Sequence, residues 1–86
     1  MCSIIGYSGK KDAAPILVRS LGKMEYRGYD SVGIATKNGN IIDVKKGVGK
    51  VSEVSQNLHL DGMSGTIGIG HTRWATHGKV TKENAH

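Results

Sequence analysis

The residue of this chain with the clearest chemical potential is Cys2, the single cysteine, which directly follows Met1. Aminopeptidases remove an initiator methionine readily when the next residue is small, and this removal would give Cys2 a free α-amine beside its thiol. A free thiol, with a pKa of about 8.5, and an α-amine, with a pKa of about 7.7–8.0, both change protonation near neutral pH. Cys2 would then be a nucleophile with its own base. The alternative is a small buried apolar residue, the usual situation of a lone cysteine.

A second group of reactive side chains occupies residues 71–78, His-Thr-Arg-Trp-Ala-Thr-His-Gly. This group follows a short apolar run, so it comes at the end of an expected strand, where scaffolds often present functional groups. Arg73 can bind a carboxylate through two parallel hydrogen bonds, and Thr76 and His77 can donate to the same anion. The alternative is an ordinary surface ion pair for Arg73, with Trp74 filling the core.

Arg27 belongs to another polar group, at residues 27–31, between an expected helix and an expected strand. Asp30 could hold its guanidinium in place. The alternative is a plain helix C-terminal turn, with Gly28 just beyond the helix. The segment 47–52, Gly-Val-Gly-Lys-Val-Ser, does not have the spacing of a phosphate-binding loop, because a Ser or Thr must directly follow the lysine.

The four histidines raise the question of a metal site. They form no His-Glu-x-x-His pair, and one cysteine cannot supply a multi-cysteine zinc site. A separation of six residues does not place His71 and His77 together on a regular strand. The sequence therefore predicts no metal site.

These groups must be positioned by a small number of elements, which hydrophobic periodicity and turn residues indicate. Asp12 is a plausible N-cap for a helix, and the dipeptide Asn38-Gly39 predicts a hairpin turn whose two central residues both have positive φ. The expected order begins with a strand at 3–7 and a helix at 12–25, whose inward residues are Ile16, Leu17, Leu21 and Met24. Strands at 32–36 and 40–45 follow, and then a helix at 51–58 with Val51, Val54 and Leu58 on one side. A loop at 59–65 leads to a strand at 66–72, whose glycines allow close approach by another backbone or a ligand.

Length and composition limit the remaining possibilities. A chain of 86 residues with 13 glycines forms at most one small domain, and we expect it to be a piece of a larger fold. The net charge of +5 comes from scattered lysines without a recognition helix or a stacking platform, which disfavours nucleic-acid binding. One cysteine forms no internal disulfide, and no apolar run approaches the roughly 20 residues of a membrane span. A soluble cytoplasmic protein is the expectation.

The opening Met-Cys-Ser-Ile-Ile-Gly at residues 1–6 resembles that of class II glutamine amidotransferases, the N-terminal-nucleophile glutaminases. Residues 25–35 and 70–78 narrow the resemblance to the glutaminase domain of the glutamine–fructose-6-phosphate aminotransferases (isomerizing), also called glucosamine-6-phosphate synthases. Amidophosphoribosyltransferases share the opening but usually have Tyr in place of Trp74. The resemblance implies an α/β (α+β) fold, an incomplete four-layer α/β/β/α sandwich. Residues 1–86 would be the N-terminal portion of this domain, with the rest of it and the sugar-isomerase domains outside the chain.

The resemblance also implies roles for individual residues. Cys2 would attack the side-chain amide of glutamine, with its α-amine as proton shuttle, and release ammonia through a γ-glutamyl thioester. Arg73 would bind the substrate α-carboxylate, with help from Thr76 and His77, while Trp74 would shape the pocket. Arg27 matches a family arginine that lies near the nucleophile, and it would support this site. The resemblance implies neither a cofactor nor a metal.

Two features depart from the family pattern. Ser3 replaces the glycine that usually follows the nucleophile, and the chain stops at His86, before the Asn-Gly pair of the oxyanion hole and the aspartate that binds the substrate amine. The full-length protein is expected to be a cytoplasmic homodimer that transfers ammonia to fructose 6-phosphate and binds neither nucleic acid nor membrane. The 86 residues alone are expected to have little or no activity. The alternative is a catalytically inactive remnant or interaction module with the same scaffold.

Overall fold

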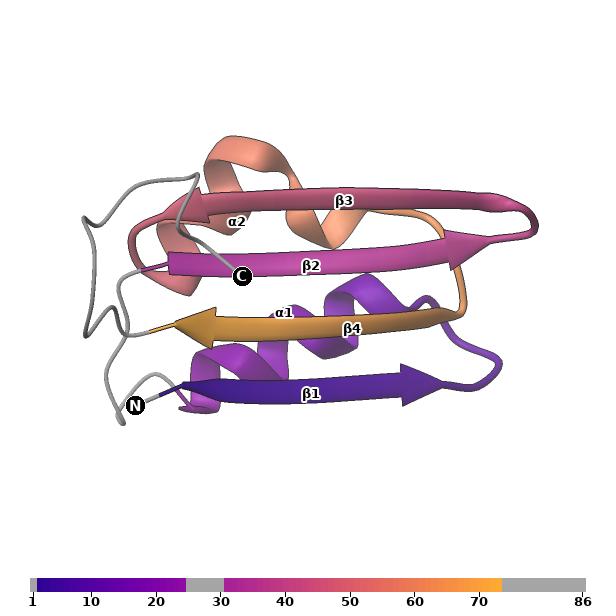
Figure 1. The fold of residues 1–86 in the computed structure, drawn as a ribbon, viewed down its shortest axis with the longest axis horizontal. Coiled ribbons are helices and arrows are strands. Elements are labelled where there is room, and N and C mark those ends of the chain that lie inside the picture. Colours follow the sequence, from indigo (N-terminus) through magenta and orange to yellow (C-terminus); the bar gives the residue numbers. More distant parts are fainter. Residues whose placement is uncertain (1, 25–30, 74–86) are drawn as a thin grey trace.

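The computed structural model describes residues 2–24 and 31–73 and shows one sheet with helices on one side (Figure 1). No helix within these ranges is long and apolar enough to cross a membrane. The elements agree with the expected order, and most boundaries differ by only one or two residues. In chain order they are β1 (Ser3–Ser8), α1 (Ala13–Met24), β2 (Ser31–Asn38), β3 (Ile41–Val48), α2 (Val51–Leu58), the 3-10 turn η2 (Leu60–Gly62) and β4 (Ile67–Arg73).

The sheet is antiparallel throughout, with the strand order β1-β4-β2-β3. The last strand in sequence, β4, therefore lies between β1 and β2. Ser3 pairs with Thr72, and Ser31 pairs with Arg73. The start of β1, the end of β4 and the start of β2 consequently meet at one end of the sheet (Figure 1).

Both helices cover the same face of the sheet and form the core with it (Figure 1). The inward stripe of α1 differs from the expected one, because Val18 rather than Ile16 packs against the core. Complete burial of one large apolar side chain contributes about 1.5–3 kcal/mol, so this layer supplies most of the cohesion of the unit. The buried apolar residues are Ala13, Ala14, Leu17, Leu21, Val32, Ile34, Val51, Val54, Leu60 and Met63.

The glycines of β4 let α1 lie directly on the strand. A Cβ at Gly68 would stand 2.9 Å from Leu17 Cδ1, and a Cβ at Gly70 would stand 2.9 Å from Leu21 Cδ1. Real Cβ atoms essentially never approach another heavy atom so closely. These two glycines are therefore required by the packing of the helix, and the alternative of a ligand at these positions is not needed to explain them.

The β2–β3 hairpin corrects one sequence-based prediction. Asn38 pairs with Ile41 as the last residue of its strand, so the two-residue loop is Gly39-Asn40 rather than Asn38-Gly39. Gly39 has φ 62°, whereas Asn40 is not among the residues with positive φ. Glycine at the first loop position is the signature of a type II′ turn, which needs positive φ at only that position.

The face of the sheet opposite the helices is apolar and open. Ile4, Val44 and Ile69 lie on it and are 77%, 61% and 56% exposed. One helical layer and one sheet layer are thus present, as expected of an incomplete four-layer sandwich. An exposed apolar face of this kind is typical of a surface that another part of a larger fold covers.

Candidate functional site

Cys2 lies immediately before β1 and is exposed. Side chains alternate along a strand, so Cys2 lies on the same face as Ile4, which is the open face. Ser3 points to the helix-covered face, where it lies opposite the buried Thr72. Replacement of the usual glycine by Ser3 therefore adds no side chain to the face that carries the thiol.

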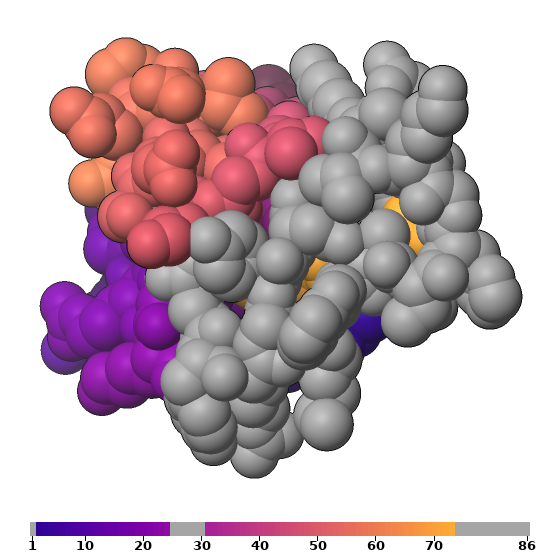
Figure 2. All heavy atoms as spheres, turned by 90° about the vertical axis from the view of Figure 1, so that its left-hand side faces the viewer, coloured from indigo at the N-terminus to yellow at the C-terminus, as the bar shows by residue number. Residues whose placement is uncertain are grey.

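Arg73 is the last residue of β4 and is half-buried. It alternates with Thr72, whose side chain is buried on the helix side, so Arg73 belongs to the open face. Extension of the Ser3–Thr72 register by one residue places Cys2 opposite Arg73. Figure 2 views this end of the molecule, where small parts of β1 in indigo and of β4 in yellow-orange are visible.

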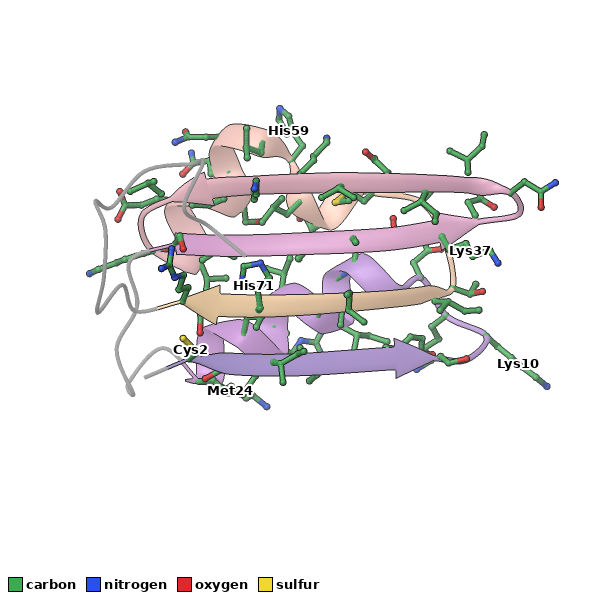
Figure 3. The ribbon with its side chains drawn as sticks, viewed as in Figure 1. Cys2, Lys10, Met24, Lys37, His59 and His71 are labelled. Atoms are coloured by element: carbon green, nitrogen blue, oxygen red, sulfur yellow. The ribbon has the colours of Figure 1, made fainter. Side chains whose placement is uncertain are left out.

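A pocket of about 570 Å³ opens on this face and includes Cys2 in its lining. Ile4, Ala35, Val44 and Ile69 supply apolar lining. Among the described residues that line the pocket, Cys2 and His71 provide the polar side chains of the open face, from neighbouring strands (Figure 3). The pocket thus combines a thiol, an imidazole and an apolar wall.

His71 belongs to the reactive group 71–78 and was weighed as a metal ligand, but the sequence assigned it no individual role in this site. The structure places its ring over Gly33, because a Cβ at Gly33 would lie 2.6 Å from His71 Nε2. The two residues are strand partners in the β2–β4 register. The sequence contains one signal of this contact. Gly33 interrupts a strand with Val, Ile and Ala, and such a glycine often marks close approach by another group.

The other predicted site residues, Trp74, Thr76, His77 and Arg27, lie outside the described residues. Within residues 2–24 and 31–73, no group of three or more His, Cys, Asp and Glu side chains could hold a metal ion. The 47–52 segment, which was rejected as a phosphate loop, is the end of β3 and the turn into α2, with Gly49 at φ 126°.

This chain has similar sequences and similar folds among known proteins. No family model matches the chain. The whole chain is 57% identical to a glutamine–fructose-6-phosphate aminotransferase (isomerizing) of Methanococcus maripaludis and 52% identical to one of Clostridium tetani. It spans 14% of the length of each of these curated relatives.

Two solved structures share the fold over the whole chain. One is a glutamine phosphoribosylpyrophosphate amidotransferase from Bacillus subtilis in complex with ADP and GMP, at 31% identity and a TM-score of 0.84. The chain belongs to the N-terminal-nucleophile glutamine amidotransferases. The other structure, an allosteric regulatory enzyme of purine biosynthesis, has 32% identity and a TM-score of 0.86. Each match covers 18% of the solved chain, so this amidotransferase segment corresponds to a minor part of the enzymes it resembles.

Within this amidotransferase segment, the described geometry can bring a thiol and a guanidinium to one substrate. The two groups come from adjacent antiparallel strands, at the same end and on the same face of the sheet. An arginine can bind a carboxylate while a thiolate attacks a carbonyl carbon in the same molecule. The arrangement therefore suits a substrate with a carboxylate at one end and an amide or ester at the other.

Proposed function

We propose that this segment carries the nucleophile and the carboxylate-binding arginine of a glutaminase site. Cys2, exposed at the start of β1, would be the nucleophile, and Arg73, at the end of β4, would bind the α-carboxylate of glutamine. The observation that supports the proposal is the β1–β4 register, which pairs Ser3 with Thr72 and, when extended by one residue, sets these two positions side by side. Trp74, Thr76, His77 and Arg27 are proposed as further members of the site from their match to the family motifs.

The proposed reaction proceeds through an acyl-enzyme. With Met1 removed, the α-amine of Cys2 takes the thiol proton and the thiolate attacks the side-chain carbonyl carbon of glutamine. The C–N bond breaks, the α-amine returns the proton to the leaving nitrogen, and ammonia departs. Water then hydrolyses the γ-glutamyl thioester to glutamate and restores the thiol. No cofactor or metal takes part in these steps.

The acceptor of ammonia is proposed from the relatives. The curated relatives are named glutamine–fructose-6-phosphate aminotransferases, which supports fructose 6-phosphate as acceptor and glucosamine 6-phosphate as product. In this proposal residues 1–86 are the N-terminal portion of the glutaminase domain, and the remaining domain and the sugar-isomerase domains belong to the full-length protein. We propose a cytoplasmic homodimer that binds neither nucleic acid nor membrane.

The first test is the intact mass of the full-length gene product from its own cell, before and after treatment with 6-diazo-5-oxo-norleucine, a glutamine-like electrophile. The expected result is a mass without Met1 and a single adduct that maps to Cys2. A Cys2→Ala variant is the matched control and should remain unlabelled. Retention of Met1 together with an unlabelled Cys2 would contradict the proposal and favour a catalytically inactive remnant.

A further inference from the structure

None of the residue roles proposed so far accounts for the contact between His71 and Gly33. The ring lies against the backbone of Gly33, on the open face of the sheet, and lines the same pocket as Cys2. A methyl group at position 33 would be 2.6 Å from Nε2, 3.2 Å from Cε1 and 3.3 Å from Cδ2. Glycine at this position therefore makes room for the imidazole.

The register fixes where this ring lies relative to the thiol. His71 pairs with Ile4, and Cys2 precedes Ile4 by two residues on the same face. Such diagonal neighbours have Cα atoms about 7–8 Å apart, a separation that long and aromatic side chains can bridge. In Figure 3 both labelled residues lie toward the same end of the sheet, Cys2 just before β1 and His71 on β4.

We propose that His71 is a positioning residue of the glutaminase site. Its imidazole, held in the space left by Gly33, forms the polar wall of the pocket beside Cys2 and orients the substrate side-chain amide against the thiol. Arg73 holds the other end of the substrate, so His71 should affect the reacting geometry more than the overall affinity. This inference rests on the proposed function.

The role of Gly33 makes the inference testable by a double-mutant cycle in the full-length gene product. Gly33→Ala should displace the ring, and His71→Ala should remove it. Each should lower kcat for glutamine hydrolysis by about tenfold or more and change KM by less than about threefold, because misplacement of reacting groups mainly affects the chemical step. The double variant should be no worse than His71→Ala alone, since without the imidazole the new methyl group has free space.

Gly6→Ala is the matched control, because Gly6 is also on the open face and an added Cβ would make only ordinary contacts of 3.8 and 3.9 Å. It should keep the wild-type kcat. His71→Gln, which retains a polar planar side chain, should recover part of the kcat lost in His71→Ala. Thermal unfolding of every variant separates a loss of folded protein from a loss of orientation.

The outcomes distinguish the two proposals. A wild-type protein that releases no glutamate from glutamine would overturn both. Two outcomes with an active wild type would show that the positioning role is wrong, while the glutaminase proposal stands. In the first, His71→Ala retains the wild-type kcat. In the second, the losses in kcat caused by Gly33→Ala and by His71→Ala multiply in the double variant. A change confined to the unfolding temperature would likewise reduce His71 to a structural residue.

Discussion

Extended by one residue, the β1–β4 register that pairs Ser3 with Thr72 places Cys2 opposite Arg73. The two residues are 71 positions apart in sequence, yet the insertion of β4 beside β1 brings them to the same end of the sheet. Both alternate onto the open face. This relationship connects the fold to the proposed chemistry and leads to the first prediction.

Arg73→Gln should raise the KM for glutamine about 10- to 100-fold in the full-length protein, because a charge-assisted hydrogen bond to a carboxylate contributes about 1.5–3 kcal/mol. The KM of Arg73→Lys should lie between those of the wild type and Arg73→Gln, since lysine keeps the charge but cannot form two parallel hydrogen bonds with a carboxylate. Steady-state glutamate release measures both. Arg19→Gln, which removes an exposed arginine of α1, is the control. An unchanged KM in Arg73→Gln would exclude Arg73 from carboxylate binding.

Gly70→Ala should destabilise the protein by about 1–3 kcal/mol, the usual range for an overpacked core. The new Cβ would stand 2.9 Å from Leu21 Cδ1, and because Leu21 is fully buried, its side chain or α1 itself must shift into already packed space. Gly22→Ala provides the control within α1, because nothing lies within 4 Å of its added Cβ. This second change should stabilise by about 0.8–1 kcal/mol through helix propensity. Urea unfolding of both variants measures the two changes in the free energy of unfolding, which should have opposite signs. Changes of the same sign would contradict this packing.

Local sequence patterns were sufficient to predict most elements. The short, apolar and β-prone run at 3–7, the periodic Leu17 and Leu21, and the Val51–Val54–Leu58 spacing all indicated the correct element types. The strand at 40–45 was predicted to end too early, because Lys46 and Gly47 look like a loop. As β3 lies at the sheet edge, it accommodates these residues up to Val48.

The strand order could not be predicted from these patterns, because the pairing of β4 with both β1 and β2 depends on long-range contacts. The same limit applied to the site. Local residue types identified Cys2 and Arg73 as candidates, but their proximity required the register. His71 was missed because its relation to Gly33 crosses two strands that are far apart in sequence.

Gly65→Ala should be more damaging than a change at another glycine of the same loop. Gly65 has φ 124°, an added Cβ would collide with the carbonyl of Lys37, and its own carbonyl accepts a hydrogen bond of 2.8 Å from the Ala13 N–H at the start of α1. Strained backbone alone costs about 1–3 kcal/mol. Gly62→Ala, with nothing within 4 Å and no positive φ, should change stability by about 1 kcal/mol or less. A chemical-denaturation midpoint for Gly65→Ala equal to that of Gly62→Ala would contradict this assignment.

Thr36→Val should stabilise the protein. Thr36 lies on the helix-covered face of β2 and is 2% exposed, and among the described residues its hydroxyl has no hydrogen-bond partner. A buried hydroxyl without a partner carries a desolvation cost of about 1–3 kcal/mol, which a methyl group of similar size avoids. The expected gain is about 1 kcal/mol in the free energy of unfolding. Thr66→Val, at an exposed threonine just before β4, should change this value by less than about 0.5 kcal/mol. A loss of stability in Thr36→Val would show that the hydroxyl is hydrogen-bonded in the full-length protein.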